Sequence, residues 1–258
     1  MRPRLVLICL ALAGAPAAAE RFSHDDWTRV LARFVDTRGM VDYQALARDR
    51  ADLDRYLARI ETRSPRSHPP LFPSRDDRLA YWINAYNAQV FQGVLARGPE
   101  RDSVWKGGLI SGKAFFEDMD IVLGGEKMSL KSLEDDIVRR EFQDPRVHAA
   151  LNCASKGCPR LPQKAFGPPK LNAELEAAMR EFAGEARNCA IDRAARTVTL
   201  SRIFDWFEGD FLDFEKRQGP RDPNVLDYVN RYRPTDAQVP RDFKIKFFEY
   251  DKRINQQP

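Results

Sequence analysis

Several features are scarce or missing in this chain of 258 residues. Its 14 glycines and 17 prolines are too few for collagen or low-complexity disorder. No apolar run reaches the roughly 20 residues that a membrane-spanning helix needs. The sequence also lacks a glycine-rich phosphate loop, a metalloprotease helix and a nucleophile-elbow serine. Nothing therefore favours a transmembrane protein, a nucleotide-binding protein, a zincin or a serine hydrolase.

An excess of charge of one sign is also missing. The formal net charge is +4, and basic and acidic residues alternate along the chain instead of forming a basic stripe. Binding to nucleic acid requires clustered positive charge, so we expect no nucleic-acid partner.

The first 19 residues have the pattern of a secretory signal peptide. Arg2 and Arg4 precede an apolar run over residues 5–14, and three alanines at 17–19 form a small-residue cleavage site. Cys9 lies inside the apolar run with no small residue before it, which disfavours a lipid anchor. We expect residues 1–19 to be removed and the remaining chain to be exported, either to the periplasm or out of the cell.

Residues 20–258 are predicted to form a single α+β domain. Leu79, Trp82, Ile83, Tyr86 and Val90 recur at helical spacing after Ser74 and indicate a long buried helix. Two β-hairpins are expected, one over 121–128 with a Gly-Gly turn and one over 190–200. Apolar runs at 147–151 and 244–250 read as further strands. The expected architecture is many helices around a small, mostly antiparallel sheet.

The cysteines give the sharpest chemical signal. Without residues 1–19 the chain has three, Cys153, Cys158 and Cys189, and export would place them in an oxidising compartment. A disulfide between Cys153 and Cys158 would close a six-residue loop and stabilise the fold by about 2 kcal/mol. Alternatively, one of these two thiols is a nucleophile, and His148 is its base or orienting group.

Strand geometry limits the second interpretation. If residues 147–151 form a straight strand, a contact between His148 and a thiol requires the segment after Leu151 to fold back, which favours Cys158 as the partner. Alternatively, Asn152 and Cys153 leave the strand and face a cleft. His148 and the two cysteines could also be three zinc ligands, but a fourth ligand and a C-x-x-C spacing are missing. We therefore predict no metal and no cofactor.

Polar residues on apolar segments are further candidates for the site. Asn84 and Asn87 share one face of the predicted buried helix, with Tyr81 one turn before. Their amides must either hold neighbouring loops or line a binding cleft, since an unpaired buried amide costs about 1–3 kcal/mol. Glu134 lies either on a solvated helix face or beside His148. Asn152 is a third amide that could line the cleft.

Two motifs resemble the signatures of the domain-of-unknown-function 547 family. The first is WINAYNA over residues 82–88, and the second is HAALNCASKGCP over residues 148–159. Shorter similarities extend the resemblance over about 41–255. The sequence departs from the family at Asp135, where a histidine often follows the glutamate. The resemblance implies a fold and a location for the site, but no established activity.

These observations favour an exported, thiol-dependent enzyme centred on the segment from His148 to Cys158. Its chemistry would be acyl transfer or hydrolysis, or thiol–disulfide exchange. The predicted binding residues are Tyr81, Asn84, Asn87, Glu134 and Asn152, and the ligand is an unidentified small molecule or peptide. The competing interpretation is a non-catalytic binding or scaffold domain with a structural Cys153–Cys158 disulfide.

Overall fold

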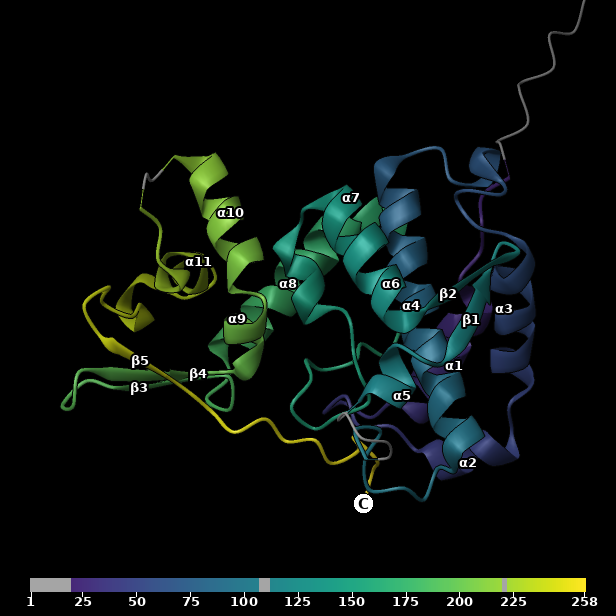
Figure 1. Ribbon diagram of the computed structural model, residues 1–258, viewed down its shortest axis with the longest axis horizontal. Coiled ribbons are helices and arrows are strands. Elements are labelled where there is room, and N and C mark those ends of the chain that lie inside the picture. Colours follow the sequence, from purple (N-terminus) through teal and green to yellow (C-terminus); the bar gives the residue numbers. More distant parts are fainter. Residues whose placement is uncertain (1–19, 107–111, 220–221) are drawn as a thin grey trace, which may run out of the picture.

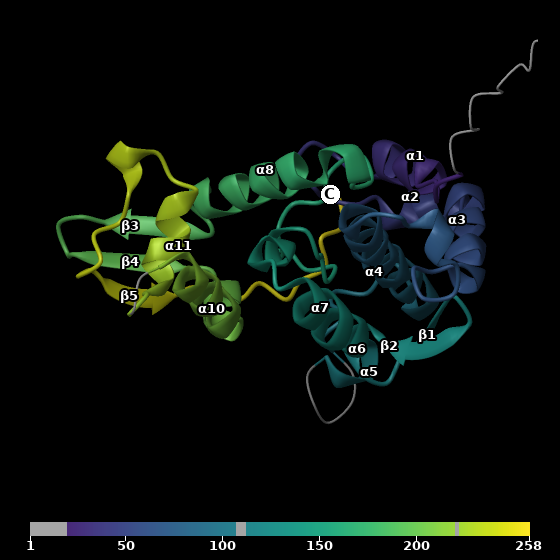
Figure 2. The same cartoon turned by 90° about the horizontal axis from the view of Figure 1, so that it is seen from above.

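Two groups of elements lie at opposite ends of the molecule (Figures 1 and 2). The computed structural model describes residues 20–106, 112–219 and 222–258. The predicted signal peptide lies outside these residues. One end contains α1 (Asp25–Phe34), α2 (Tyr43–Arg48), α3 (Ala51–Thr62), α4 (Arg75–Arg97), α5 (Lys113–Phe116), α6 (Leu130–Ser132) and α7 (Arg140–Phe142). The other contains α9 (Arg202–Trp206), α10 (Glu208–Gln218) and α11 (Val225–Arg231). Helix α8 (Leu171–Gly184) runs between the two ends.

Each end has its own hydrophobic core. The first core is built mainly from α1–α4, and the second from α9–α11 and the neighbouring strands. Helix α8 contributes to both, because Leu171 and Leu175 pack into the first core and Met179 and Phe182 into the second. One continuous helix therefore joins the two cores.

Helix α4 is the buried central helix that the sequence predicts. Ser74 Oγ accepts from the Asp77 backbone N–H at 3.0 Å, and Asp77 Oδ2 accepts from the Ser74 N–H at 2.9 Å. This reciprocal pair is a capping box, which satisfies two amides that the first turn leaves unpaired. Gly98, with φ of 99°, ends the helix. Residues on all sides of α4 are buried, so its polar groups must find partners inside the protein.

Both predicted hairpins are present, in two separate sheets. Strands β1 (Asp120–Leu123) and β2 (Glu126–Ser129) pair antiparallel around Gly124 and Gly125, whose φ values of 62° and 83° suit a two-residue turn. Strands β3 (Cys189–Asp192) and β4 (Thr197–Leu200) form the second hairpin. Strand β5 (Lys244–Phe247) joins β4 in parallel and makes this sheet mixed. The α+β class is confirmed, with the strands divided between the two ends.

The expectation of a strand over residues 147–151 is wrong. The segment Pro145–Ala149 is a 3₁₀ helix, preceded by Asp144, whose side chain accepts from the Arg146 N–H at 3.2 Å. Pro145 fixes φ at a value that suits a helical first turn. The segment is apolar because it is buried near the junction of the two cores: Val147 belongs to the first and Ala149 to the second. A short buried helix and a short buried strand have the same composition.

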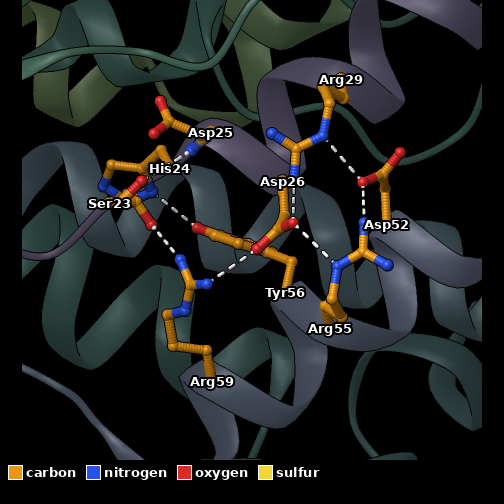
Figure 3. Close-up of polar contacts among 9 residues, drawn as sticks. All are labelled: Ser23, His24, Asp25, Asp26, Arg29, Asp52, Arg55, Tyr56 and Arg59. Carbon is orange, nitrogen blue, oxygen red and sulfur yellow. Dashed lines mark hydrogen bonds and ion pairs between the residues drawn. The ribbon is translucent and has the colours of Figure 1, made fainter.

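A network of charges joins α1 to α3 far from the cysteines (Figure 3). Asp26 is only 3% exposed and accepts from Arg55 at 3.1 Å and from Arg59 at 2.8 Å, and it also contacts Arg29. A buried carboxylate is tolerated only when it is paired in this way. The network fixes the position of α1 against α3.

No helix in the described part of the chain has both the length and the apolar character needed to cross a bilayer.

Candidate functional site

The segment after Leu151 folds into a tight loop that brings two cysteines together. Asn152 Oδ1 accepts from the Ala154 N–H at 2.9 Å, while its Nδ2 donates to the Pro159 carbonyl at 2.8 Å. Ala154 lies in the left-handed region with φ of 58°, which reverses the chain. The backbone N–H of Cys153 then points at Cys158 Sγ, 3.0 Å away. The buried side-chain amide of Asn152 therefore holds both ends of the loop.

Cys153 and Cys158 approach to 2.6 Å, and neither is in a disulfide in this structure. The hydroxyl of Tyr250 contacts both sulfurs, 3.0 Å from Cys153 Sγ and 3.2 Å from Cys158 Sγ. Gly157 permits this contact, because a Cβ there would lie 2.8 Å from Cε2 of the Tyr250 ring. Cys189, the third cysteine, is buried in the second core.

The pKa values of the two thiols are shifted in opposite directions. Burial works against a charged Cys158, but hydrogen bonds from Cys153, Tyr250 and the loop backbone outweigh it and lower the pKa of Cys158. The pKa of Cys153 is raised well above its ordinary value, first by its hydrogen bond to Cys158 and then by burial. Successive backbone N–H groups around a left-handed residue form an anion-binding concavity. The first proton therefore leaves the pair from Cys158, and the thiolate is held by the loop.

Both sulfurs face a cavity of about 230 Å³, which we call the thiol pocket. Its walls come from both ends of the molecule. They consist of Tyr86, Trp105, Gly112, Lys113, Phe116, Glu117, Lys131, Glu134, Asp135, His148, Leu151, Cys153, Cys158, Pro159, Ile203, Trp206, Phe207 and Tyr250. Pockets for drug-sized ligands measure roughly 300–1,000 Å³, so this one admits a small group or a single side chain.

His148 lines the thiol pocket and is paired with Asp210. Its Nε2 lies 2.8 Å from Asp210 Oδ2, which also accepts from Arg139 Nε at 2.8 Å. Because a carboxylate only accepts, Nε2 carries the proton and Nδ1 is left as an acceptor. The ring stacks on Phe207 with centroids 4.0 Å apart. Burial lowers the pKa of His148, and this effect exceeds the opposing influence of Asp210, so the imidazole is neutral near pH 7.

Glu134 also lines the thiol pocket, on a π-helical segment, Leu133–Arg139. Its Oε2 accepts from the Tyr86 hydroxyl at 3.1 Å. Burial and the neighbouring Asp135 raise the pKa of Glu134 to about 7. The side chain is half-buried in the cavity wall and does not lie on a solvated helix face. It is not the hydrogen-bond partner of His148, which pairs with Asp210 instead. Glu134 can hold or release a proton near neutral pH.

The remaining predicted binding residues lie outside the thiol pocket. Asn84 exchanges hydrogen bonds with the Phe166 backbone, at 2.9 Å to its carbonyl and 3.1 Å from its N–H. Asn87 donates to the Ala150 carbonyl at 2.9 Å and accepts from the Asn152 N–H at 2.9 Å. Each amide thus satisfies one buried donor and one buried acceptor. We call Asn84, Asn87 and Asn152 the amide cluster.

Tyr81 has a similar place in the fold. Its hydroxyl donates to the Arg63 carbonyl at 2.7 Å and to the Ile60 carbonyl at 3.2 Å, and the side chain is fully buried. It therefore anchors the end of α3 to α4. Of the eight predicted site residues, the structure brings Glu134, His148, Cys153 and Cys158 to one cavity. Tyr81, Asn84 and Asn87 lie in the interior, and Asn152 borders a different hollow.

Residues 71–183 match the model of a family described as "Protein of unknown function, DUF547". This segment, which is less than half of the chain, is similar to the DUF547 family. The match contains α4, the π-helical segment and the cysteine loop. No curated protein and no solved structure matches the chain.

The matched DUF547 segment contains only part of the thiol pocket. Trp206 and Tyr250, which line the pocket, and Asp210, which pairs with His148, come from beyond residue 183, and sequence reasoning missed all three. Asp210 reads as one acid on a solvated helix, and Tyr250 follows the last strand with no spacing that ties it to a cysteine 97 positions earlier. The similarity of the segment 248–251 to the family was the one available signal for Tyr250.

In the described residues, no group of three or more His, Cys, Asp and Glu side chains is arranged to hold a metal ion. The acids and bases of the pocket are instead partnered with side chains of the protein.

Proposed function

We propose that the protein is a thiol-dependent enzyme that catalyses thiol–disulfide exchange with Cys153 and Cys158. The observation that carries this proposal is the close approach of the two cysteines beneath one shared hydroxyl, Tyr250, at the wall of a cavity. A dithiol that forms and breaks a disulfide needs its sulfurs within a small movement of the bonding distance of about 2.05 Å.

Cys158 is the attacking sulfur in this proposal. Its thiolate attacks one sulfur of a substrate disulfide, a protein–substrate S–S bond forms, and the substrate S–S bond breaks. The departing thiolate takes a proton from Glu134, the pocket carboxyl whose pKa is near 7. Cys153 then loses its proton and attacks Cys158, which releases the second substrate thiol. The substrate gains two electrons and the protein dithiol is oxidised. A second thiol compound returns the protein to the dithiol form.

His148 and Asp210 contribute a neutral base in the same cavity. Since Asp210 fixes the proton on Nε2, Nδ1 can accept the proton that Cys153 loses in the second attack. The predicted export of the chain suits this chemistry, because substrate disulfides form in oxidising compartments. Export itself stays a prediction from residues 1–19.

The first experiment is a redox titration in glutathione or dithiothreitol buffers, with alkylation and mass spectrometry to count free thiols. Exchange proteins have potentials of roughly −120 to −270 mV, whereas structural disulfides lie below about −300 mV. We expect a reversible Cys153–Cys158 disulfide in the first range. A potential below −300 mV would support the scaffold interpretation, and the absence of any disulfide would contradict exchange.

The roles of the two cysteines can then be distinguished by trapping a mixed disulfide. A Cys153→Ser variant should accumulate a mixed disulfide on Cys158, since the resolving sulfur is missing. The matched Cys158→Ser variant should accumulate less, because burial still raises the pKa of Cys153 when the hydrogen bond to Cys158 is gone. Trapping on Cys153 alone would reverse the proposed roles.

Acyl transfer is the second candidate, favoured by the His148–Asp210 pair in the same pocket as the thiols. A cysteine assisted by a histidine that an acid orients is the usual arrangement for acyl chemistry. Incubation with an activated ester or thioester and mass spectrometry would distinguish it, since an acyl adduct on Cys158 requires this chemistry and exchange does not produce one.

A further inference from the structure

Glu134 and Cys158 line the same pocket, and this pairing suits a leaving group more basic than a thiolate. A thiolate released from a disulfide has a conjugate acid of pKa about 8.5, so it can leave without a proton. Hydroxide has a conjugate acid of pKa about 15.7, so it must take a proton as it leaves. A protonated carboxyl beside a thiolate therefore favours the cleavage of a bond to oxygen over that of a bond to sulfur.

Tyr86 links the Glu134 carboxyl to the two thiols. Its hydroxyl donates to Glu134 Oε2 at 3.1 Å, which leaves Oε1 to carry the carboxyl proton. Burial raises the pKa of Tyr86 well above its ordinary value, and negative charge on Glu134 and on the two thiols raises it further. The phenol therefore stays a donor and lies within electrostatic reach of the carboxyl and of both sulfurs.

Cys158 has the surroundings of an oxidation-sensitive cysteine. Its Sγ is held by the Cys153 N–H at 3.0 Å and by the Tyr250 hydroxyl at 3.2 Å. Such cysteines are stabilised as thiolates, border a site that a reagent enters, and lie next to a second cysteine. Here the second sulfur, that of Cys153, is 2.6 Å away. Cys189 is buried in the second core and burial raises its pKa, so it serves as an internal reference.

The volume of the thiol pocket favours a small electrophile. Its 230 Å³ is less than the roughly 300–1,000 Å³ of sites for drug-sized ligands. The electrophile must accept two electrons from a thiolate and release an oxygen leaving group that takes a proton. A small hydroperoxide, R–O–O–H, meets these requirements.

We propose that the protein reduces small hydroperoxides in the thiol pocket, with Cys158 as the sulfur that is oxidised, Cys153 as the sulfur that resolves it, and Glu134 as the proton donor to the leaving oxygen. This inference rests on the roles that the proposed function gives to the two cysteines, but it requires no substrate disulfide.

The reaction has two steps in the pocket. The Cys158 thiolate attacks the terminal oxygen of the hydroperoxide, an S–O bond forms, the O–O bond breaks, and the departing oxygen takes the proton of Glu134 to give an alcohol or water. Cys158 is then a sulfenic acid. The Cys153 thiol attacks this sulfur, the disulfide forms, and the thiol proton leaves with the hydroxyl group as water. A dithiol compound reduces the disulfide, and Glu134 regains a proton from solvent.

Two reactions of Cys158 with different leaving groups test the role of Glu134. Iodoacetamide releases iodide, which needs no proton, whereas hydrogen peroxide releases hydroxide. At pH 6, Glu134→Gln should slow oxidation of Cys158 by hydrogen peroxide roughly 10²-fold and alkylation less than about twofold. Quenched samples analysed by mass spectrometry give both rates. The exposed Glu208→Gln on α10 is the matched control and should change neither. Equal changes in both rates, or no change in either, would overturn the proposal.

The ratio of the peroxide rate to the alkylation rate also depends on pH. The titratable and charged groups around Glu134 are Asp135, Lys131 and Arg139 of its own helical stretch, Tyr86 of α4, Lys113 and Glu117 from α5 and the residue after it, and His148, Cys153, Cys158 and Tyr250 across the pocket.

Burial holds the pKa of Glu134 at about 7, so the wild-type ratio should be constant below about pH 6 and fall roughly tenfold per pH unit above 7. Both reactions need the Cys158 thiolate, and only one needs the carboxyl proton. In Glu134→Gln the ratio should not change with pH. A wild-type ratio that is independent of pH would contradict proton donation by Glu134.

The resolving step is tested in Cys153→Ser. Oxidised Cys158 should persist there as a sulfenic acid, which a 1,3-diketone labels, because no thiol displaces the hydroxyl group. The wild type treated in the same way should give the Cys153–Cys158 disulfide without a labelled intermediate. A label on Cys189 in place of Cys158 would overturn the assignment.

Single-turnover oxidation separates this inference from the proposed function. Hydrogen peroxide should oxidise Cys158 of the reduced wild type roughly 10²-fold faster than Cys189. Such oxidation, with no reaction toward oxidised glutathione or a peptide disulfide, would overturn exchange with substrate disulfides and keep the peroxide activity. Exchange with these disulfides, while peroxide oxidises Cys158 no faster than Cys189, would keep the exchange activity and overturn this inference.

Discussion

The amide cluster and the thiol pocket lie on either side of one short segment, residues 150–153, and both are rich in buried polar groups. In the amide cluster, Asn84, Asn87 and Asn152 each pair with backbone groups and face no cavity wall of the thiol pocket. In the thiol pocket, Cys158, His148 and Glu134 border a cavity, and the acidities of all three groups are shifted by their surroundings.

The difference shows how polar residues of the same motif divide their roles. A buried amide is neutral and can be satisfied completely by four backbone groups, so it stabilises the fold without chemistry. A thiol, an imidazole or a carboxyl can exchange a proton, and burial beside an opening moves its pKa toward a useful range. We therefore expect changes in the amide cluster to alter stability and changes in the thiol pocket to alter reactivity.

The largest expected effect is on the proposed exchange activity. Cys158→Ser should lower the exchange rate by about 10³-fold or more, since the attacking sulfur is missing. The free energy of unfolding should change by less than about 1 kcal/mol, because the hydroxyl can still accept from the Cys153 N–H. Stopped-flow exchange kinetics and urea unfolding measure the two quantities, and Cys189→Ala serves as the control for activity. Full activity in Cys158→Ser would remove the distinction between the two regions.

The next largest effect is on stability. Asn87→Ala leaves the Ala150 carbonyl and the Asn152 N–H without their buried partner and should lower the free energy of unfolding by roughly 3–4 kcal/mol. The exposed Asn172→Ala should change it by less than about 0.5 kcal/mol. The folded fraction of Asn87→Ala should keep its exchange rate per molecule. A loss of rate without a loss of stability would place Asn87 in the reacting cavity.

A third effect concerns the pH dependence of stability. The pKa of Glu134 is about 7 in the folded protein, above its ordinary value of 4.5. Between pH 4.5 and 7, the folded form therefore holds a proton on Glu134 that the unfolded form has released. Stability from this group is therefore fully present below pH 4.5 and is lost as the pH rises to 7, by about 3 kcal/mol. His148, whose pKa is lowered, acts in the opposite direction, since its contribution to stability is lost as the pH falls below its ordinary value of 6.5.

The Glu134→Gln variant isolates this contribution. Between pH 4.5 and 7, the free energy of unfolding of the wild type should fall by about 3 kcal/mol relative to that of the variant. Glu208→Gln, an exposed change, should show no such shift. A pH-independent difference between Glu134→Gln and wild type would show that Glu134 is ionised throughout and cannot supply the proton.

The smallest predicted effect is at Tyr250. Tyr250→Phe removes the hydroxyl that lowers the pKa of Cys158, so alkylation by iodoacetamide near pH 7 should slow about tenfold. The rate at high pH, where the thiol is fully ionised, should stay the same. Gly157→Ala, which pushes on the same ring, should give a similar but weaker change. Equal slowing at every pH would indicate lost access to the pocket instead of lost acidity.

Much of the local structure could be predicted because it depends on neighbouring residues. The capping box at Ser74, the Gly-Gly turn at 124–125 and the buried helix between them follow from propensity and apolar spacing. The segment 147–151 was predicted wrongly as a strand, because its burial removes the apolar period that distinguishes a helix from a strand.

The candidate site could be predicted only where its residues lie close together in the sequence. His148, Cys153 and Cys158 stand within eleven positions and were found, whereas the roles of Asn84 and Asn87 were left open. Whether an amide binds a ligand or a loop depends on which backbone atoms arrive beside it, and those atoms lie 63 to 82 positions away.

The sequence alone determined the resemblance of residues 71–183 to the DUF547 family, the α+β class and the presence of two nearby thiols with a histidine. The tertiary structure decided that these thiols share the hydroxyl of Tyr250, that Asp210 holds His148, and that Trp206 borders the cavity. Tyr250, Asp210 and Trp206 belong to the other end of the molecule, which α8 joins to the end that contains α4. Their contacts depend on how two hydrophobic cores pack along one helix, and no local pattern in the sequence encodes that packing.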